Sequence, residues 1–145
     1  MQLQILTFED PKVLQCVAIR RKVFIEEQHV PEDREQDGLD PIARHYLFTQ
    51  DGKPIGAARS RLEGKQIKIE RFAFLPEARG SGRGAEAFQA VIDDCLAFYP
   101  ALPIKIGAQA YLRGFYERLG FKGIGEPFVD AGIDHVWMTY TAHMN

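Results

Sequence analysis

Polar and apolar residues follow two different periods along this chain. In some segments they alternate at every second residue, as in a strand with one buried face, and in others apolar residues recur about every 3.6 residues, as in an amphipathic helix. The strand-like segments are 3–8, 43–49, 55–62, 67–75, 103–107, 121–128 and 133–141. The helix-like segments are 11–28, 85–99 and 108–119. Their order, β-α-β-β-β-α-β-α-β-β, predicts an α/β fold with one mixed sheet and helices on both faces.

Turn and capping residues support these boundaries. Asp10-Pro11 is typical of a helix start, with a capping carboxylate followed by proline at the first helical position. Asp51-Gly52 lies between two strand-like segments and indicates a hairpin turn. Gly120 is in position to end the third helix. Segment 103–107 is apolar without alternation, which favours a central strand.

Composition and charge narrow the functional classes. The chain has 145 residues, of which 46% are hydrophobic and 26% charged, so residues 1–145 are expected to form one globular domain. A net charge of -2 argues against general nucleic-acid binding, and no apolar run is long enough to cross a membrane. Cys16 and Cys95 fall in helix-like segments, where buried thiols are expected. With no signal-peptide pattern at the N-terminus, these features predict a cytoplasmic protein, and the absence of metal-ligand spacings predicts no metal.

The most informative stretch is a glycine-rich loop between the strand-like segment 67–75 and the helix-like segment 85–99. Its glycines carry no Cβ atom, so an anion can approach the backbone closely. The helix that follows directs unpaired N–H groups and the positive end of its dipole at that anion. The loop therefore predicts a pyrophosphate site formed by Arg79, Gly80, Ser81, Gly82, Arg83 and Gly84, with the two arginines adding charge.

The loop has three other possible interpretations. A P-loop NTPase needs lysine and then serine or threonine after the last glycine, whereas Ala85 and Glu86 follow Gly84. A dinucleotide fingerprint fits only loosely, because residues 76–79 separate the strand from the loop and the next strand ends without the acid that would bind a ribose. From the loop alone, a plain glycine-rich connection stays open.

Longer segments carry a resemblance to a known family. Residues 70–84 resemble the coenzyme A-binding segment of GNAT-superfamily N-acetyltransferases, whose signature Arg79, Gly82 and Gly84 match. Residues 115–121, Phe-Tyr-Glu-Arg-Leu-Gly-Phe, resemble the second hallmark of that family. Within this superfamily, the chain most resembles the ElaA-like group of small bacterial acetyltransferases, through segments 21–28, 43–45, 108–110 and 132–135. The resemblance covers nearly the whole chain.

This resemblance implies acetyl-CoA as co-substrate and a small-molecule or peptide amine as acceptor, with no covalent intermediate. The strand through Phe72, Ala73 and Phe74 would splay away from segment 103–107 and bind the pantetheine arm through its backbone. A backbone N–H near Phe74 would polarise the thioester carbonyl. The resemblance also implies that Gln109 binds the cofactor and that the last strands form a homodimer contact.

Tyr116 and Glu70 are the candidate catalytic residues. Tyr116 would protonate the departing thiolate as a general acid, or it is simply an aromatic residue on the core face of its helix. Glu70 would accept the proton of the amine as a general base, or it pairs with a strand neighbour at a solvated edge. Strict alternation would put Glu70 on the same strand face as Phe72 and Phe74.

The acceptor side is predicted from weaker signals. The residues that match the ElaA-like segments and are expected to contact the acceptor are Glu27, Gln28, His45 and His135. Five acidic residues within 32–40 either attract a cationic amine or, as the favoured interpretation, form a solvated loop. Phe128 and Trp137 are expected in the core. For the whole chain, the alternatives are a non-catalytic coenzyme A-binding or regulatory module, or the same fold with another acyl-CoA.

Overall fold

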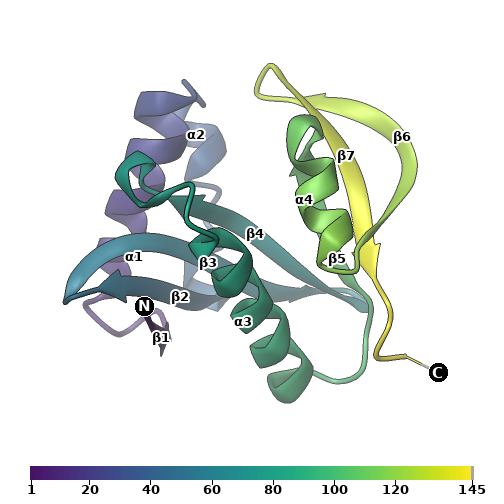
Figure 1. Ribbon diagram of the computed structural model, residues 1–145, viewed down its shortest axis with the longest axis horizontal. Coiled ribbons are helices and arrows are strands. Elements are labelled where there is room, and N and C mark those ends of the chain that lie inside the picture. The colour runs from purple at the N-terminus through teal and green to yellow at the C-terminus, as the bar shows by residue number, and fades with distance from the viewer. Residues whose placement is uncertain (145) are drawn as a thin grey trace.

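Seven strands form one sheet in the order β1-β2-β3-β4-β5-β7-β6, as the computed structural model shows for the residues that it describes, 1–144 (Figure 1). The strands are β1 (Gln2–Leu6), β2 (Arg44–Gln50), β3 (Lys53–Glu63), β4 (Gln66–Phe74), β5 (Ile104–Gln109), β6 (Lys122–Asp130) and β7 (Ile133–Tyr140). All neighbours pair antiparallel except β4 and β5, which are parallel. The predicted mixed sheet is confirmed.

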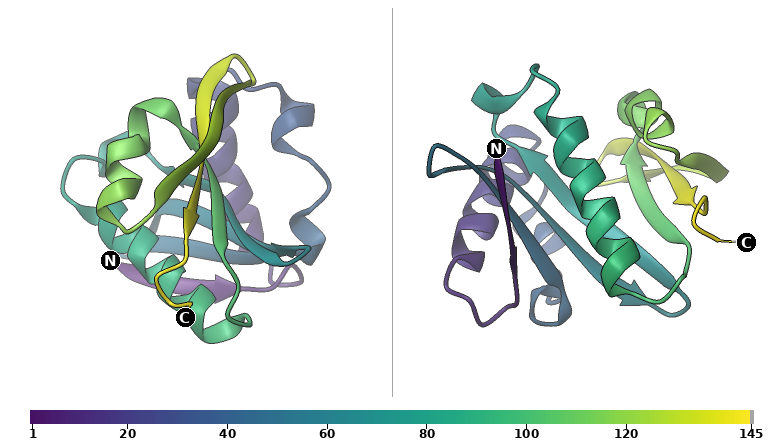
Figure 2. Two further views of the ribbon diagram at one scale, coloured as in Figure 1. Left: turned by 90° about the vertical axis from the view of Figure 1, so that its right-hand side faces the viewer. Right: turned by 60° about the horizontal axis from the view of Figure 1, so that its bottom comes forward.

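Helices cover both faces of this sheet (Figure 2). The helices are α1 (Val13–Arg20), α2 (Glu32–Glu35), α3 (Arg83–Phe98) and α4 (Arg113–Arg118). Residues of α1 pack with β2 and β3 on one face, whereas α3 and α4 share the core on the other face. The predicted order of the main elements is confirmed, and the short helix α2 is an addition that no periodic pattern in the sequence indicated.

Two helix boundaries differ from the sequence expectation. The first helix begins at Val13, since the Asp10 carboxylate accepts a hydrogen bond from the Lys12 N–H at 2.9 Å and holds the preceding residues in a turn. It then continues as a π-helix (Arg21–Glu27), closed by a 3.1 Å bond from the Gln28 N–H to the Val23 carbonyl. The third expected helix, 108–119, begins later than expected, because its first residues belong to β5 and α4 covers only Arg113–Arg118. Gly120, with φ +103°, ends this helix as expected.

Two separate cores fix these helices on the sheet. On one face Phe88, Val91 and Ile92 of α3 pack with strand residues such as Phe48 and Ile67. On the opposite face the buried residues are Leu6, Val13, Cys16, Ile19, Val23, Leu47, Ala57 and Ala73. Cys16 and Cys95 lie in different cores as free, buried thiols, as expected. Burial raises their pKa values to about 12 and about 11, so both stay protonated.

The central pair of strands separates after a short contact. β4 and β5 pair only at Ile67 with Ile104 and at Lys68 with Lys105, and beyond these residues the strands diverge (Figure 1). The sheet is thereby divided into a β1–β4 half and a β5–β7–β6 half that stay joined at one end. The splay predicted between segment 67–75 and segment 103–107 is confirmed.

A β-bulge in β4 changes which side chains face each helix. The register shifts between Ala57 and Arg59 of β3, and Arg71 has a left-handed backbone with φ +58°. Phe72 packs edge-on against Phe88 of α3 at 4.9 Å, while Glu70 contacts Arg59, which in turn bonds Asp40 beside α1. Glu70 therefore lies on the face opposite Phe72 and Phe74, and the strict alternation expected from the sequence was wrong.

Candidate active site

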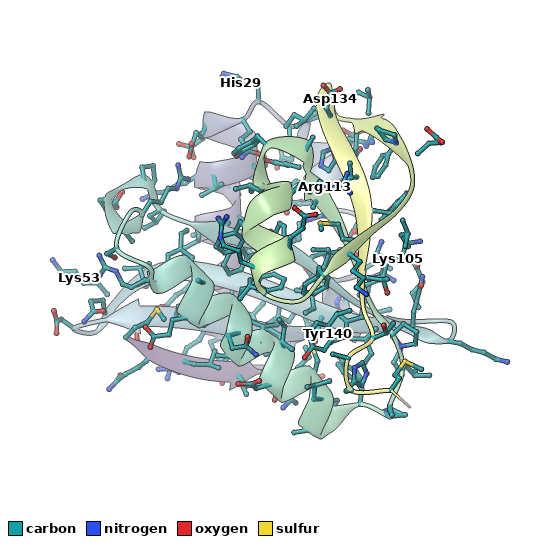
Figure 3. All side chains as sticks on the ribbon, turned by 45° about the vertical axis from the view of Figure 1, so that its right-hand side comes forward. His29, Lys53, Lys105, Arg113, Asp134 and Tyr140 are labelled. Atoms are coloured by element: carbon teal, nitrogen blue, oxygen red, sulfur yellow. The ribbon has the colours of Figure 1, made fainter. Side chains whose placement is uncertain are left out.

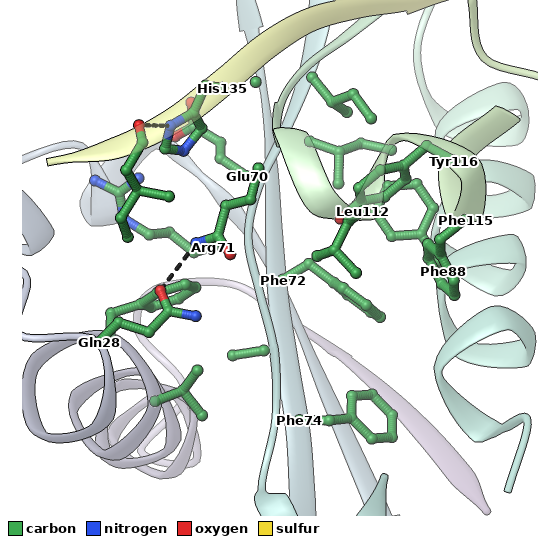
Figure 4. A pocket seen from close by; sticks show the side chains of 18 of the residues that line it. Gln28, Glu70, Arg71, Phe72, Phe74, Phe88, Leu112, Phe115, Tyr116 and His135 are labelled. Carbon is green, nitrogen blue, oxygen red and sulfur yellow. Dashed lines mark hydrogen bonds between the residues drawn. The ribbon is translucent and has the colours of Figure 1, made fainter. Parts of the chain in front are cut away.

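A cavity of about 790 Å³ occupies the splay between β4 and β5. Figure 4 shows its two sides, with Phe88, Leu112, Phe115 and Tyr116 on one side and Gln28, Glu70, Arg71 and His135 on the other. We refer to them as the α3 side, which also includes Gly80, Gly82 and Gly84, and the α1 side, which also includes Arg34, Glu35, Lys68, Phe128 and Trp137. The strand residues Phe72, Ala73 and Phe74 line the cavity between the two sides.

The glycine loop forms an open, backbone-built end of the α3 side. Gly80 and Gly82 have φ values of +90° and +79°, which residues with a side chain rarely adopt. An added Cβ would meet no atom within 4 Å at either position, so the space beside the loop is free. Gly82 is the N-cap of α3 and provides no side-chain cap, so the first N–H groups of a 16-residue helix are left for another acceptor. These are the features of an anion site.

The two arginines of the loop have different partners in the structure. Arg79 donates to both carboxylate oxygens of Glu27 at 2.8 Å and to the Phe74 carbonyl at 3.0 Å. It thus ties the loop to the ends of the π-helix and β4, and its hydrogen bonds lower the pKa of Glu27. Arg83 donates to the Ser81 hydroxyl at 2.7 Å. The predicted contribution of both arginines to an anion stays a prediction.

The edge of β4 beyond the bulge offers a backbone donor to the cavity. The Leu75 N–H donates to the Ile55 carbonyl of β3 at 2.9 Å. Because successive N–H groups of a strand point in opposite directions, the Phe74 N–H points away from β3 and into the splay. A carbonyl oxygen bound there would receive a hydrogen bond in a site with apolar walls, Phe72 and Leu112 among them.

Tyr116 belongs both to the core and to the cavity wall. Its ring is 7% exposed and packs edge-on against Phe88 at 5.1 Å, with Phe115 and Phe121 also in contact. Within residues 1–144 the hydroxyl makes no hydrogen bond, and the residue lines the cavity. Burial raises the pKa of the phenol, so it stays protonated and available as a hydrogen-bond donor.

Glu70 is held by cations on the α1 side. It accepts hydrogen bonds from Arg59 and from Arg61 at 3.0 and 3.1 Å, and the Lys68 ammonium lies 3.4 Å away. Burial opposes its ionised form, but the Arg61 hydrogen bonds and the charge of Arg59 outweigh burial and lower its pKa to about 2. Pairing with strand neighbours, the second sequence interpretation, is thus what the structure shows, although at a position only 12% exposed. A carboxylate of this pKa is a weak base near neutral pH.

Three of the five acids in segment 32–40 are bound in an arginine network, while Glu32 and Asp33 are exposed. Glu35 is 1% exposed and pairs with Arg20 and Arg71, each at 3.0 Å. Arg59 bonds Asp37 and Asp40, whose carboxylates also pair with Arg71 and Arg20 at 3.1 and 2.8 Å. Both sequence interpretations of these three acids were therefore wrong, because arginines on α1, β3 and β4 neutralise them.

His45 is also displaced from its expected place. It is 0% exposed, does not line the cavity, and bonds the Asp40 carbonyl through Nε2 at 2.9 Å. Burial lowers its pKa and keeps it neutral. The expected contact of His45 with the acceptor was wrong because strand β2 lies behind the ion network, away from the splay.

The other predicted acceptor-side residues do line the cavity. The Gln109 side chain donates to the Gln28 side chain at 2.9 Å, a bond across the splay between β5 and the end of the π-helix (Figure 4). His135 lines the α1 side, where its Nδ1 lies 2.7 Å from the Ile133 carbonyl. Glu27 is present through its pair with Arg79. Their contacts with substrates stay predictions.

Comparison with known proteins decides the family. The family model described as the acetyltransferase (GNAT) domain matches residues 7–142.

The chain belongs to the GNAT acetyltransferase family.

Its relatives include the uncharacterised protein YyaT of Bacillus subtilis, 34% identical over 86% of each chain, and the protein ElaA of Escherichia coli, 30% identical over 83% of this chain and 81% of ElaA. The crystal structure of E. coli ElaA superposes with a TM-score of 0.88 at 26% identity and covers 97% of this chain and 99% of that one. An acyl-CoA N-acyltransferase from Pseudomonas aeruginosa gives a TM-score of 0.86 at 26% identity and covers 96% and 98%. The similarity to ElaA and the acyltransferase class expected from the sequence are confirmed.

Structures at 13% and 15% identity share the fold alone, and they include acetyltransferases solved with coenzyme A and with acetyl-CoA. In this GNAT chain, residues 1–144 contain no helix that is long and apolar enough to span a membrane. The same residues hold no group of three or more His, Cys, Asp or Glu side chains placed to bind a metal.

Two aromatic residues of this GNAT acetyltransferase were misplaced by sequence reasoning. Phe128 and Trp137 stack at 4.5 Å and line the α1 side of the cavity instead of lying in either core. They lie over Gly107 of β5, where an added Cβ would come within 3.2 Å of the Trp137 ring. Lys105, labelled in Figure 3, lies over the same ring at 4.3 Å. The sequence did contain one indication of this arrangement: Gly107 lies in a central apolar strand, where a glycine often allows another group to approach the backbone closely.

Proposed function

We propose that this GNAT acetyltransferase transfers the acetyl group of acetyl-CoA to a primary amine by direct attack. The observation that carries the proposal is the cavity itself, which passes through the splay from a backbone anion site to a side-chain-lined chamber. A donor bound on the α3 side and an acceptor bound on the α1 side would meet at the free edge of β4. Such positioning turns a bimolecular reaction into an effectively unimolecular one.

The chain would hold acetyl-CoA mainly through its backbone. The N–H groups of Gly80, Gly82, Arg83 and Gly84 would bind the pyrophosphate, and Ser81 and Arg83 would flank it. The pantetheine arm would pair with Phe72, Ala73 and Phe74 along the free edge of β4, and Gln109 would close the opposite wall. The acetyl-CoA and coenzyme A complexes of proteins that share this fold support coenzyme A as the class of ligand.

The chemistry would take place beside Phe74 and Tyr116. The Phe74 N–H would stabilise the oxyanion that forms when the neutral amine attacks the thioester carbonyl. Tyr116 would donate a hydrogen bond to the sulfur as negative charge develops on it, which its buried, protonated phenol suits. The low pKa of Glu70 favours solvent water over this carboxylate as the proton acceptor, so Glu70 would instead hold Arg59 and Arg61 in place.

The test is an acetyl-CoA thiol-release assay with a panel of amines, combined with calorimetry of coenzyme A binding. Transfer to at least one amine, with the acetylated product identified by mass spectrometry, is the expected result. Coenzyme A binding without transfer to any amine would favour a binding or regulatory module. Faster transfer from propionyl-CoA or a longer acyl-CoA would identify another donor, and no coenzyme A binding at all would contradict the proposal.

A further inference from the structure

The acids that line the cavity are all occupied by arginines. Within the described residues 1–144, Glu27 pairs with Arg79, Glu35 with Arg20 and Arg71, Glu70 with Arg59 and Arg61, and Asp130 with Arg34. Each carboxylate is thus already paired with a guanidinium. A polycationic acceptor would have to displace one of these pairs; those of Glu35 and Glu70 are buried and costly to open, whereas those of Glu27 and Asp130 are exposed.

Arg71 is a largely buried cation on the α1 side that keeps unused donors. Its Nε and Nη2 atoms bond Glu35, Asp37 and the Arg34 carbonyl at 3.0 to 3.3 Å. Its Nη1 makes no hydrogen bond within residues 1–144, and the side chain is 23% exposed and lines the cavity. The bulge and these bonds hold the guanidinium in one orientation, with two N–H donors unused.

Stacked aromatic rings also line the α1 side. Phe128 stacks on Trp137 at 4.5 Å and on His135 at 5.4 Å, and all three line the α1 side. Lys68, which is 15% exposed and lies 5.2 Å from the Trp137 ring, adds a second cation, although its ammonium already pairs with Glu70 at 3.4 Å. The α1 side therefore offers both a flat aromatic surface and the unused donors of Arg71.

From this arrangement, and resting on the proposed function, we propose that the acceptor is an amine that also carries a carboxylate on an apolar body. Nη1 of Arg71 binds the carboxylate, and the apolar body lies against Phe128 and Trp137. A guanidinium that is already fixed loses little freedom when it receives a carboxylate, and such charge-assisted bonds are among the stronger ones in proteins. Apolar amino acids belong to this class, whereas polyamines and aminoglycosides do not.

The experiment compares acceptors that differ only in the carboxylate. Phenylalanine is measured against phenylalaninamide and 2-phenylethylamine, and 6-aminohexanoate against hexylamine. The acid of a pair should have a kcat/KM about 10 to 100 times that of its uncharged partner, the range expected for a hydrogen bond to a charged group. Equal values in both pairs, or faster transfer to the uncharged amines, would overturn the inference while leaving the acetyltransferase function intact.

A variant ties the preference to Arg71. In Arg71→Met, the kcat/KM of each acid divided by that of its uncharged partner should fall to about 1. Arg61→Met is the control: it removes an arginine that pairs with Glu70 but does not line the cavity, so it should keep the ratio of the parent enzyme. The ratio is measured within each variant, so partial loss of folded protein does not affect it. If Arg71→Met does not fold, Arg71→Lys replaces it and should reduce the ratio without abolishing it. An unchanged ratio in the Arg71 variant would overturn the assignment.

A binding arm separates this inference from the proposed function. Calorimetry measures N-acetylphenylalanine and N-acetylphenylalaninamide against the complex with coenzyme A. Tighter binding of the acid supports a carboxylate site even if no amine is acetylated, in which case only the proposed function fails. Equal affinities, or no binding of either compound, count against the carboxylate site.

Discussion

The two sides of the cavity are built in different ways. At its open end, the α3 side consists of glycines, unpaired N–H groups and a helix N-terminus, all from one stretch of the chain between β4 and α3. The α1 side consists mainly of charged and aromatic side chains that come from α2, β4, β6 and β7 and are supported by arginines of α1 and β3. A backbone site depends on local conformation, while a side-chain site exists only once distant elements have packed. The following experiments separate these two dependencies.

The largest effect is expected from Arg59→Met on the α1 side. Arg59 is 0% exposed and binds Asp37, Asp40 and Glu70, so its loss leaves buried carboxylates without their central partner. Breaking a buried pair in this way costs about 3–5 kcal/mol of folding free energy. Urea denaturation followed by circular dichroism measures the loss. The exposed pair Arg21–Glu32 is the control, and Glu32→Gln should cost no more than about 1 kcal/mol.

On the α3 side, Gly82→Val should weaken coenzyme A binding by about 100-fold or more while the protein stays folded. Gly82 has φ +79°, which a β-branched residue rarely adopts, so valine would force the backbone of the loop into another conformation. The N–H groups of the proposed pyrophosphate site would then turn away. Calorimetry with acetyl-CoA measures the affinity, and Gly64→Val, at a turn with φ +60° outside the cavity, controls for backbone strain. Unchanged affinity in Gly82→Val would exclude this loop as the pyrophosphate site.

Tyr116→Phe tests the junction of the two sides. The variant keeps the ring in its aromatic core and removes only the hydroxyl, so turnover should fall about 10- to 100-fold, as for one hydrogen bond to developing charge. The Michaelis constant for acetyl-CoA should change less than turnover. Steady-state kinetics separates the two parameters. Full activity would return Tyr116 to a purely structural role.

Low pH should destabilise the fold through the ion pairs that support the α1 side. The pKa values of Asp37 and Glu70 are lowered to about 2 from ordinary values of 3.8 and 4.5, in both cases because the arginine hydrogen bonds and charges outweigh burial. Groups with a depressed folded-state pKa contribute stability above their unfolded pKa and lose it as pH falls, here from about pH 4.5 to about pH 2. Thermal unfolding followed across this range should show a falling melting temperature. A flat profile would mean that the network contributes little.

The smallest effect is expected for the pH–rate profile of Glu70→Gln. With a pKa of about 2, Glu70 is ionised throughout the neutral range and cannot set the shape of the profile there. The profiles of variant and parent should therefore have the same shape between about pH 6 and 9, even if turnover differs by a constant factor. A selective loss of rate at the low end, where little free amine exists, would restore Glu70 as the general base.

Local chain chemistry explains which sequence predictions succeeded. Asp51 and Gly52 adopt positive φ values of +51° and +79° in the predicted hairpin, and Gly120 ends its helix as expected. The apolar periods correctly predicted the element order, because burial of one face follows directly from the period. The prediction for Glu70 failed because a bulge at Arg71 reverses the alternation, and a bulge is set by the pairing of β3 with β4.

By itself, the sequence determined the fold order and the glycine-rich loop before α3. Both depend on short-range properties: hydrophobic period, positive-φ glycines and an uncapped helix start. Only the tertiary structure decided the charges and surfaces of the α1 side. Glu35, Asp37 and Asp40 look like a solvated acidic loop until Arg20, Arg59 and Arg71 arrive from other elements. Phe128 and Trp137 look like core residues until the splay exposes them. Pairing and exposure are long-range properties, because they depend on which distant residues meet.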